Sequence, residues 1–360
     1  MRHASTPPEA TLRQQIKDEA RRLGFILAGV TTPSPPPHAG AFEEWLRRGH
    51  HGSMRYLAEA RSRRRRADPL QIMPECKSIL VLAMPYPDPS QAEPPTPAGW
   101  LGRVAAYAWG TDYHDVIPEK LRALVAFIQQ HVAQPVLSRV YTDTGPLLER
   151  DLAQRAGLGW IGKNTCLINP RWGSYFLLAE ILLDLELQPD AAFEADRCGT
   201  CTRCQEACPT SCILPNRTLD ARACISYLTI ELRGSIPMNL RAKMADWIFG
   251  CDVCQMVCPW NRFSPAAEDG PWLGESFGQM PLLEQLQLLP EGFRVRFRGS
   301  AIRRSKHGGY LRNAAVAAGN IAGPQAIPVL RRAADIGGPL VKEHADWAIG
   351  QIAERESRHR

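Results

Sequence analysis

The chain has 360 residues, 44% of them hydrophobic and 22% charged, and its 30 prolines and 28 glycines follow no short period. This composition excludes collagen-like, low-complexity and disordered chains, and the length allows two or three domains with buried cores. The net charge is +6, and the last 70 residues hold all of the excess, with 13 lysines and arginines against 6 acidic residues. A neutral body with a basic tail predicts a polyanionic partner, above all a nucleic acid, although a solvated basic face is an equally weighted alternative.

The sequence also predicts a compartment. The most apolar stretch, residues 175–187, is too short to cross a bilayer as a helix, and the amino-terminal residues lack the apolar core of a secretory signal. We therefore expect a cytoplasmic protein without membrane contact. In that reducing compartment, cysteines crowded between positions 198 and 258 predict metal ligation rather than disulfides.

The first 190 residues mix helical and strand patterns. Residues 10–23 have the apolar spacing of an amphipathic helix that leads into a strand at residues 24–30, before a proline-rich break. Further patterns predict strands at residues 78–84 and 136–141 and a helix at residues 120–131. These elements predict a mixed α/β domain over residues 1–190.

A proline- and glycine-rich connector near residues 264–274 precedes a helical tail. Residues 312–321 align with residues 343–352, and a further helix is predicted at residues 327–334 between them. This spacing is typical of stacked helix pairs of the HEAT type, but two copies are too few for a free-standing stack, so the tail must pack on the body.

The cysteine spacing is the most specific pattern in the chain. The run Cys198-x2-Cys201-x2-Cys204-x3-Cys208-Pro209 is that of bacterial ferredoxins, and Cys251-x2-Cys254-x3-Cys258-Pro259 follows it, with Cys224 between the two. In two-cluster ferredoxins the fourth cysteine of each run serves the other cluster. We therefore predict two 4Fe-4S clusters, with ligand sets as follows: Cys198, Cys201, Cys204 and Cys258 for the first, and Cys208, Cys224, Cys251 and Cys254 for the second.

Structural zinc is the alternative for these cysteines. Zinc needs only two Cys-x2-Cys pairs, however, and gives no reason for a third cysteine at the next step or for Cys-Pro at both ends. Cys76, Cys166 and Cys212 remain without a ligand role, and we expect Cys212 to be a buried bystander. Two clusters that move single electrons predict either a relay protein or an enzyme, and the domains on either side favour the enzyme.

Several longer motifs resemble the epoxyqueuosine reductase family, in the same order and over about residues 10–352. They are Trp109-Gly110-x-Asp112-Tyr113-His114-Asp115-Val116, the run from Asp143 to Arg150, the run from Ala156 to Thr165, Gly173-Ser174-Tyr175, the run from Cys224 to Thr229, and Gly250-Cys251-Asp252-x-Cys254-Gln255. The chain departs from the family at Ser211-Cys212, where Gly-Ala is usual, which leaves the ligand count untouched. The resemblance implies an α+β fold in three parts: a mixed α/β cobalamin-binding catalytic domain (1–190), a ferredoxin-like double 4Fe-4S domain (191–265) and a HEAT-like helical tRNA-binding domain (275–360).

The resemblance also implies a reaction. The enzyme reduces epoxyqueuosine to queuosine at the wobble position of tRNA, losing the oxygen as water, with electrons from an external low-potential donor passing through the two clusters to cobalamin. Asp143 resembles the proton donor, which requires a carboxyl that stays protonated near neutral pH. From the residues alone, Asp143 is as readily a helix cap, because Pro146 follows it closely.

Cobalamin has no motif of its own in this chain. The Asp-x-His-x-x-Gly pattern that supplies a cobalt ligand elsewhere is absent, since Asp112-Tyr113-His114 does not continue it. By family position the cofactor contacts are Arg66, Asp143, Gly162, Lys163, Leu167, Ser226 and Asp252. Alternative roles are a solvated turn lysine for Lys163, a turn for Gly162, core packing for Leu167 and a helix cap for Ser226.

We expect the basic tail to hold the tRNA backbone, because a wobble base must be swung out of its loop. The expected phosphate contacts are Arg294, Arg296 and Arg298, alternating as on an extended segment, together with Arg303, Arg304, Lys306 and Arg312. A monomer is expected. Two other functions stay open: a reductive-dehalogenase-like cobalamin reductase, which leaves the basic tail unexplained, and a non-enzymatic ferredoxin-type electron carrier that docks on an RNA-processing partner.

Overall fold

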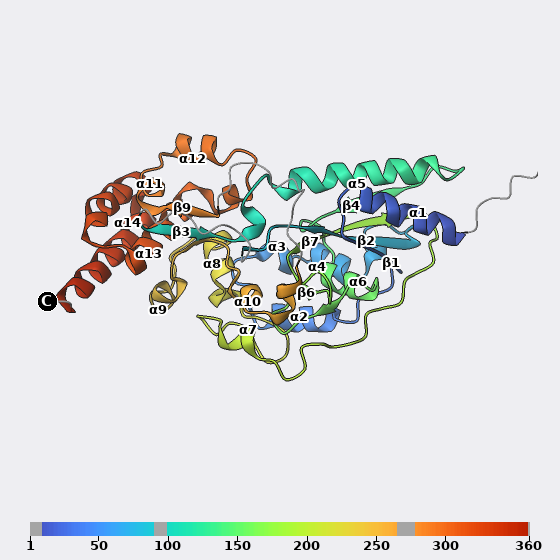
Figure 1. Cartoon of the computed structure of the whole chain (residues 1–360), viewed down its shortest axis with the longest axis horizontal. Coiled ribbons are helices and arrows are strands. Elements are labelled where there is room, and N and C mark those ends of the chain that lie inside the picture. The colour runs from blue at the N-terminus through green and yellow to red at the C-terminus, as the bar shows by residue number, and fades with distance from the viewer. Residues whose placement is uncertain (1–8, 90–98, 265–277, 359–360) are drawn as a thin grey trace, which may run out of the picture.

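The computed structural model describes residues 9–89, 99–264 and 278–358, and its first half is built on a four-stranded antiparallel sheet (Figure 1). The strands lie in the order β1-β2-β7-β4 and span Leu27–Thr31, Ser78–Pro85, Phe176–Leu183 and Ser138–Tyr141. The predicted strands at residues 78–84 and 136–141 are thereby confirmed. The first strand starts at Leu27 rather than at residue 24.

Helices cover both faces of this sheet because the side chains of β2 point alternately to each face. Leu80 and Leu82 pack with α1 (Glu9–Arg22) and α5 (Tyr113–Gln130), whereas Ile79 and Val81 pack with α6 (Glu149–Arg155). A strand buried on both faces has a continuous apolar sequence instead of an alternating one, which is the pattern of residues 78–84. The α1–α5 layer and α6 lie on opposite sides of the sheet in Figure 1.

A second sheet joins parts of the chain that are distant in sequence. Its order is β8-β3-β9, with β3 (Leu101–Val104) parallel to β8 (Trp247–Phe249) and antiparallel to β9 (Gln279–Pro281). Each of the three predicted domain ranges contributes one strand. The division at 1–190, 191–265 and 275–360 stays a prediction, and the predicted connector near residues 264–274 lies outside the described residues beyond its first position.

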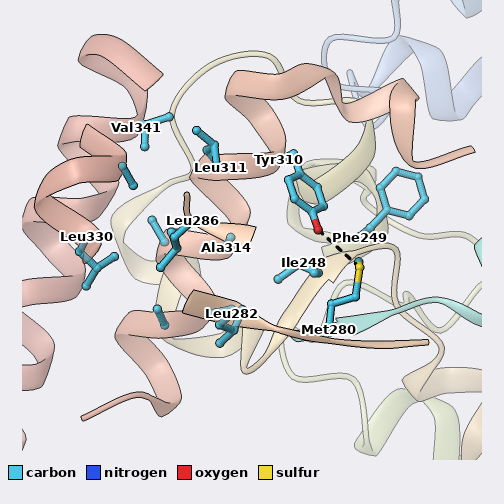
Figure 2. Close-up of a cluster of buried hydrophobic side chains, with 14 of the residues drawn as sticks. Ile248, Phe249, Met280, Leu282, Leu286, Tyr310, Leu311, Ala314, Leu330 and Val341 are labelled. Atoms are coloured by element: carbon cyan, nitrogen blue, oxygen red, sulfur yellow. Dashed lines mark hydrogen bonds between the residues drawn. The ribbon is translucent and has the colours of Figure 1, made fainter. Parts of the chain in front are cut away.

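The tail packs on this second sheet, as the short repeat required. Figure 2 shows Leu311 and Ala314 of α13 (Lys306–Ile321) facing Leu330 and Val341 of α14 (Ile327–Arg358) in a core shared with Met280. The α14 helix breaks at Gly338, whose φ is 68°, so the two aligned sequence segments lie in α13 and in the second part of α14. A Cβ on Gly319 would meet the Ala348 Cα at 2.8 Å, which shows how closely the two helices approach. The HEAT-type stacking itself stays a prediction.

The remaining elements are short, as expected for the cysteine-rich segment. Figure 1 shows α7, α8 and α10 between the first sheet and the tail. The other described elements are α2 (Ala39–Arg47), α3 (Arg55–Ala58), α4 (Ala60–Ala67), β5 (Trp160–Ile161), β6 (Leu167–Ile168), α7 (Arg203–Glu206), α8 (Ile225–Ile230), α9 (Met238–Arg241), α10 (Val253–Met256), α11 (Leu282–Gln285) and α12 (Pro290–Arg296).

The extended segment predicted around Arg294, Arg296 and Arg298 is wrong. Residues 290–296 form α12, which starts with a proline in its first turn, where the missing N–H costs no hydrogen bond. Among the described residues, no helix combines the length and the apolar character that crossing a bilayer demands.

Candidate active site

Four of the predicted cluster cysteines form one group. Cys258, which follows α10, lies within electrostatic range of Cys198 and Cys204, and Cys204 in turn lies within range of Cys201. Two helices that pack on each other, α7 and α10, bring these thiols together from positions 50 to 60 residues apart in the chain. The group has the four thiols that a 4Fe-4S cube requires.

The other four predicted ligands form a second group. Cys251 lies within electrostatic range of Cys208 and Cys224, and Cys254 lies within range of Cys251 and Cys224. The chain therefore folds so that the last cysteine of each run lies with the thiols of the other run, the arrangement that crossed ligation of two clusters needs. The donor set of eight predicted ligand thiols fits two 4Fe-4S clusters, and Cys166 and Cys212 lie beside the second group.

The surplus cysteines occupy three different surroundings. Cys212 is buried, as expected, but its Sγ lies 3.5 Å from that of Cys208, and it also contacts Cys224. Cys166 lies next to Cys254. Cys76 lies apart in the core beside the first sheet, where its thiol donates to the carbonyl of Ser78 at 3.3 Å.

The turn that carries Gly162 and Lys163 holds the loop of the first thiol group. The Lys163 Nζ donates to the carbonyls of Gly199 and Cys201 at 2.8 and 2.9 Å, so the solvated-lysine alternative is wrong. The Trp160 indole N–H points to the Cys198 Sγ at 3.4 Å. Leu167 is buried and pairs with Ile161 across β5 and β6, which is a core position.

Asp143 lies in the loop between β4 and α6 with a left-handed backbone, at a φ of 56°. It does not cap a helix, because α6 begins six residues later at Glu149. Its backbone N–H donates to the Glu149 Oε1 at 2.7 Å, and its own Oδ2 accepts a hydrogen bond from the Tyr113 hydroxyl at 2.9 Å. The Asp143 side chain is 63% exposed, so the carboxyl is accessible from solvent while these contacts fix its orientation.

His114 completes this centre from the first turn of α5. Its Nδ1 lies 2.8 Å from Asp112 Oδ1, and its Nε2 lies 3.5 Å from Asp143 Oδ2. Burial opposes a charge on the imidazole, but the hydrogen bond with Asp112 and the charges of Asp112 and Asp143 outweigh it and raise the pKa of His114 to about 9. The imidazole is therefore protonated at neutral pH.

The charge of His114 changes the expected state of Asp143. Desolvation by the groups packed around it would raise the pKa of Asp143, but the nearby His114 imidazolium and the hydrogen bond from Tyr113 outweigh it and lower the pKa. The expectation of a carboxyl that is itself protonated near neutral pH is therefore wrong for the free enzyme. The proton of this pair lies on His114, next to the ionised Asp143.

Two further carboxyls lie beneath the Asp143 loop. Glu180 on β7 is fully buried and pairs across the sheet with Val81 and Tyr141, which directs it to the face that α6 covers. There it lies close to Glu149, and neither of its carboxylate oxygens has a hydrogen-bond partner among the described residues. Burial and then the charge of Asp143 raise the pKa of Glu149 to about 8, so the carboxyl that accepts from the Asp143 backbone is mostly uncharged at neutral pH.

Three predicted cofactor residues lie around this centre in different ways. The guanidinium of Arg66 is buried, donates to the carbonyl of Gly145 at 3.3 Å and thereby supports the Asp143 loop. Asp252 is buried, and its Oδ2 accepts from the Ala106 N–H at 2.7 Å. Ser226 lies inside α8, whose cap position belongs to Cys224, so its capping alternative is wrong.

Most of the predicted tRNA-contact residues lie on the surface of the tail. Arg294, Arg298, Arg303, Arg304 and Lys306 are exposed, and Arg296 is partly exposed. Arg304 forms an ion pair with Glu231 at 2.8 Å, and its charge helps to lower the pKa of Asp143, which puts the tail beside the candidate catalytic carboxyl.

Arg312 is not part of this surface. It is fully buried in α13, and its guanidinium donates to the carbonyls of Leu228, Leu232 and Gly234 at 2.6 to 2.8 Å. The prediction of a phosphate contact at Arg312 is therefore wrong, because its donors are already taken by the segment that follows Cys224.

The residues that control Asp143 are not identified by any pattern in the sequence. Asp112, Tyr113 and His114 appeared only within a resembling motif and as an incomplete cobalt-ligand pattern. Glu180 could have been singled out from the sequence, because an acidic residue in the middle of an apolar strand indicates a buried carboxyl. Glu149, at the start of α6, is indistinguishable in sequence from an ordinary helix-start carboxylate.

Comparisons with known proteins agree with this geometry. Residues 197–261 match a 4Fe-4S double cluster binding domain, and residues 66–144 match the family "Epoxyqueuosine reductase QueG, DUF1730". The epoxyqueuosine reductase of Pseudomonas aeruginosa is 40% identical over 355 residues, covering 97% of each chain. The structure of the Streptococcus thermophilus enzyme superposes with a TM-score of 0.86 at 30% identity, covering 95% of this chain and 90% of that one.

A further solved structure is an epoxyqueuosine reductase with an epoxyqueuosine-modified tRNA-Tyr stem loop. It has a TM-score of 0.86 and 29% identity, and the match covers 96% of this chain and 91% of that one. Identity and coverage this high, over both the thiol segment and the Asp143 segment, show that this chain belongs to the epoxyqueuosine reductase family.

Proposed function

We propose that this protein is an oxidoreductase that reduces epoxyqueuosine to queuosine in tRNA. Family membership supports this reaction, and so does the stem-loop complex of a structural relative. The observation in this chain that carries it is the position of Asp143. Its exposed carboxyl lies beside the His114 imidazolium and within electrostatic range of Arg304 in the basic tail, on a body that also gathers eight cluster thiols.

The cofactors are two 4Fe-4S clusters and cobalamin, and an external low-potential donor provides the electrons. The clusters bind to the two thiol groups described above, and the matching double-cluster family supports them. When bound, cobalamin supplies a low-valent cobalt suited to electron delivery. Asp143 and Asp252 both fit the lining of such a site, since burial and then the charges of both carboxyls raise the pKa of Tyr107, which puts the two near one buried ring.

Backbone atoms make most of the cofactor contacts of the other predicted residues, which are Arg66, Gly162, Lys163, Leu167 and Ser226. The Arg66 guanidinium is held by Gly145 and Ser62, and the Lys163 ammonium by the first thiol loop. A Cβ on Gly162 would meet the Ile168 Cδ1 at 2.5 Å. These contacts shape the wall of the site, and few of the side chains keep a polar group free for a ligand.

Asp143 delivers protons to the oxygen that leaves the epoxide. The Tyr113 hydroxyl and the Glu149 carboxyl hold the Asp143 loop in place during this step. The exposed tail residues Arg294, Arg296, Arg298, Arg303, Arg304 and Lys306 hold the backbone of the anticodon loop by charge, so that the modified base can enter.

The test uses the full chain, reconstituted anaerobically with iron, sulfide and cobalamin, and a tRNA that carries epoxyqueuosine. Asp143→Asn should keep the cluster absorbance and the bound cobalamin but lose at least about 100-fold in turnover, the size of a general-acid contribution. Asp115→Asn is the matched control, since this acid on the same helix as His114 is exposed. Wild-type turnover by Asp143→Asn would contradict the role of Asp143 as proton donor, and no turnover by the wild-type protein itself would favour an electron carrier.

A small-organohalide reductase is the other outcome of the same assay. Turnover of a halogenated phenol together with no conversion of the modified tRNA would replace the proposed substrate. A protein purified without iron would contradict the cluster assignment before any activity is measured.

A further inference from the structure

The proton balance of the proposed reaction raises a question about Asp143. Conversion of an epoxide to an alkene breaks two C–O bonds, consumes two electrons and two protons, and releases water, so both protons end on the same oxygen. One carboxyl can carry one proton at a time. In the free enzyme Asp143 carries none, because its neighbours stabilise the carboxylate.

His114 lies where a second proton carrier would have to be. Its Nε2 faces the Asp143 Oδ2 at 3.5 Å and has no hydrogen-bond acceptor within bonding geometry among the described residues. Its Nδ1 is oriented by Asp112, which also accepts from the His114 backbone N–H at 3.0 Å. The ring is fixed further by stacking on Tyr113 at a centroid distance of 4.0 Å.

Asp112, His114 and Asp143 form a row in which only the contact between His114 and Asp112 is a closed hydrogen bond. The inner carboxylate, Asp112, holds the imidazole so that its Nε2–H points to the outer carboxylate, Asp143, which is the more exposed of the two. Hydrogen bonds of this kind are often long in a free enzyme and shorten when substrate binds. A small rotation of the Asp143 carboxyl would close the gap.

We propose that His114 is a positioning residue that loads Asp143 with both protons in turn. In each transfer the Nε2–H bond of His114 breaks and an O–H bond forms on Asp143. That bond then breaks as the proton moves to the substrate oxygen. The two electrons come from the external low-potential one-electron donor. The His114 Nε2 is covered while Asp143 faces it, although 34% of the side chain is exposed, so His114 regains its proton between the two transfers when the Asp143 carboxyl turns towards the substrate.

The charged groups around His114 keep its imidazole protonated over the physiological pH range, as this role requires. Asp112 and Asp143 are its two acidic neighbours, Tyr113 is neutral, and Arg304, whose charge acts on Asp143, is already paired with Glu231. The relay therefore begins in the charged state at neutral pH, and it fails when His114 loses its proton at higher pH.

The inference rests on the proposed function, and its test starts from a wild-type protein that converts the modified tRNA. The measurement is the single-turnover rate of pre-reduced, reconstituted enzyme on an epoxyqueuosine stem loop from pH 6 to 10. The wild-type rate should fall above about pH 9, as His114 deprotonates. His114→Gln should be slower by about 100-fold at pH 7 and should lose this high-pH decline.

Two further variants separate proton supply from structure. Imidazole added to His114→Ala should restore part of the rate, more at pH 6 than at pH 8, because only the protonated form can donate. His131→Gln, at the other end of α5, should leave both the rate and the pH profile unchanged.

Three results would overturn the relay while leaving the proposed function intact. They are a wild-type rate in His114→Gln, a variant that is slower but keeps the high-pH decline, and an absence of imidazole rescue in a protein that retains both clusters. If the wild-type protein itself fails to convert the tRNA, the proposed function fails instead.

Discussion

The thiol segment and the Asp143 centre differ in how much of their chemistry can be predicted from the sequence. In the thiol segment the residue type, the spacing and the final grouping agree, because seven of the eight ligands lie in two short runs. At the Asp143 centre the working groups come from the start of α5, from a loop after β4 and from the 3-10 turn that holds Arg304. Only the fold brings them together.

The two regions also treat charge differently. The cysteines of the thiol groups bind metal as negatively charged thiolates, and the iron of a cluster offsets that charge. The thiol segment therefore depends on its cofactor. The Asp143 centre balances its charges with protein groups, His114 and Arg304 against Asp112 and Asp143. It follows that the thiol segment should lose a whole cluster when one ligand is lost, whereas the Asp143 centre should lose rate and keep its structure.

The largest effect is expected from a single ligand change in the second thiol group. Cys251→Ser should lose one cluster, which lowers the iron content from about eight to about four atoms per chain, and it should abolish turnover. Iron analysis and low-temperature EPR of the reduced protein measure this directly. Asp143→Asn is the comparison, because it should keep all of the iron; an equal loss of iron in both variants would show that the two regions do not act separately.

A buried cation gives the next largest effect, this time on stability. Arg312→Leu removes donors from three backbone carbonyls after Cys224 and should lower the free energy of unfolding by roughly 2–4 kcal/mol. Denaturant titration measures it. Arg303→Leu removes the same charge from an exposed position nine residues earlier and should change stability by less than about 0.5 kcal/mol. Equal losses would contradict the structural role of Arg312.

Arg312 also shows where sequence reasoning stops. Its neighbours in sequence are those of a basic surface, and nothing local distinguishes it from Arg303, because burial is decided by packing against α8 and β8. The same limit applies to α12, where a helix replaced the predicted extended segment. The strand at residues 78–84, by contrast, was predictable, since a buried strand needs a continuous apolar run and the chain has one.

Site residues follow the same division. The cysteine groups were predictable because metal ligation imposes spacing on the chain. Asp143 was found through resemblance, and its protonation state was mistaken because this depends on His114, 29 positions away. A pKa is set by neighbours in space, and a sequence without an alignment does not identify them.

The smallest effect concerns the exposed face of the tail. Arg303 and Lys306 are exposed beside Arg304, so the double variant Arg303→Ala, Lys306→Ala should weaken binding of a tRNA stem loop by about 1–2 kcal/mol and reduce the steepness of its salt dependence by about two phosphate contacts. Fluorescence anisotropy at several salt concentrations measures both quantities. Arg331→Ala, Arg332→Ala removes two exposed charges from α14 and serves as the control. If the wild type and both double variants showed the same dependence of tRNA affinity on salt concentration, net charge, and not this face near Asp143, would attract the RNA.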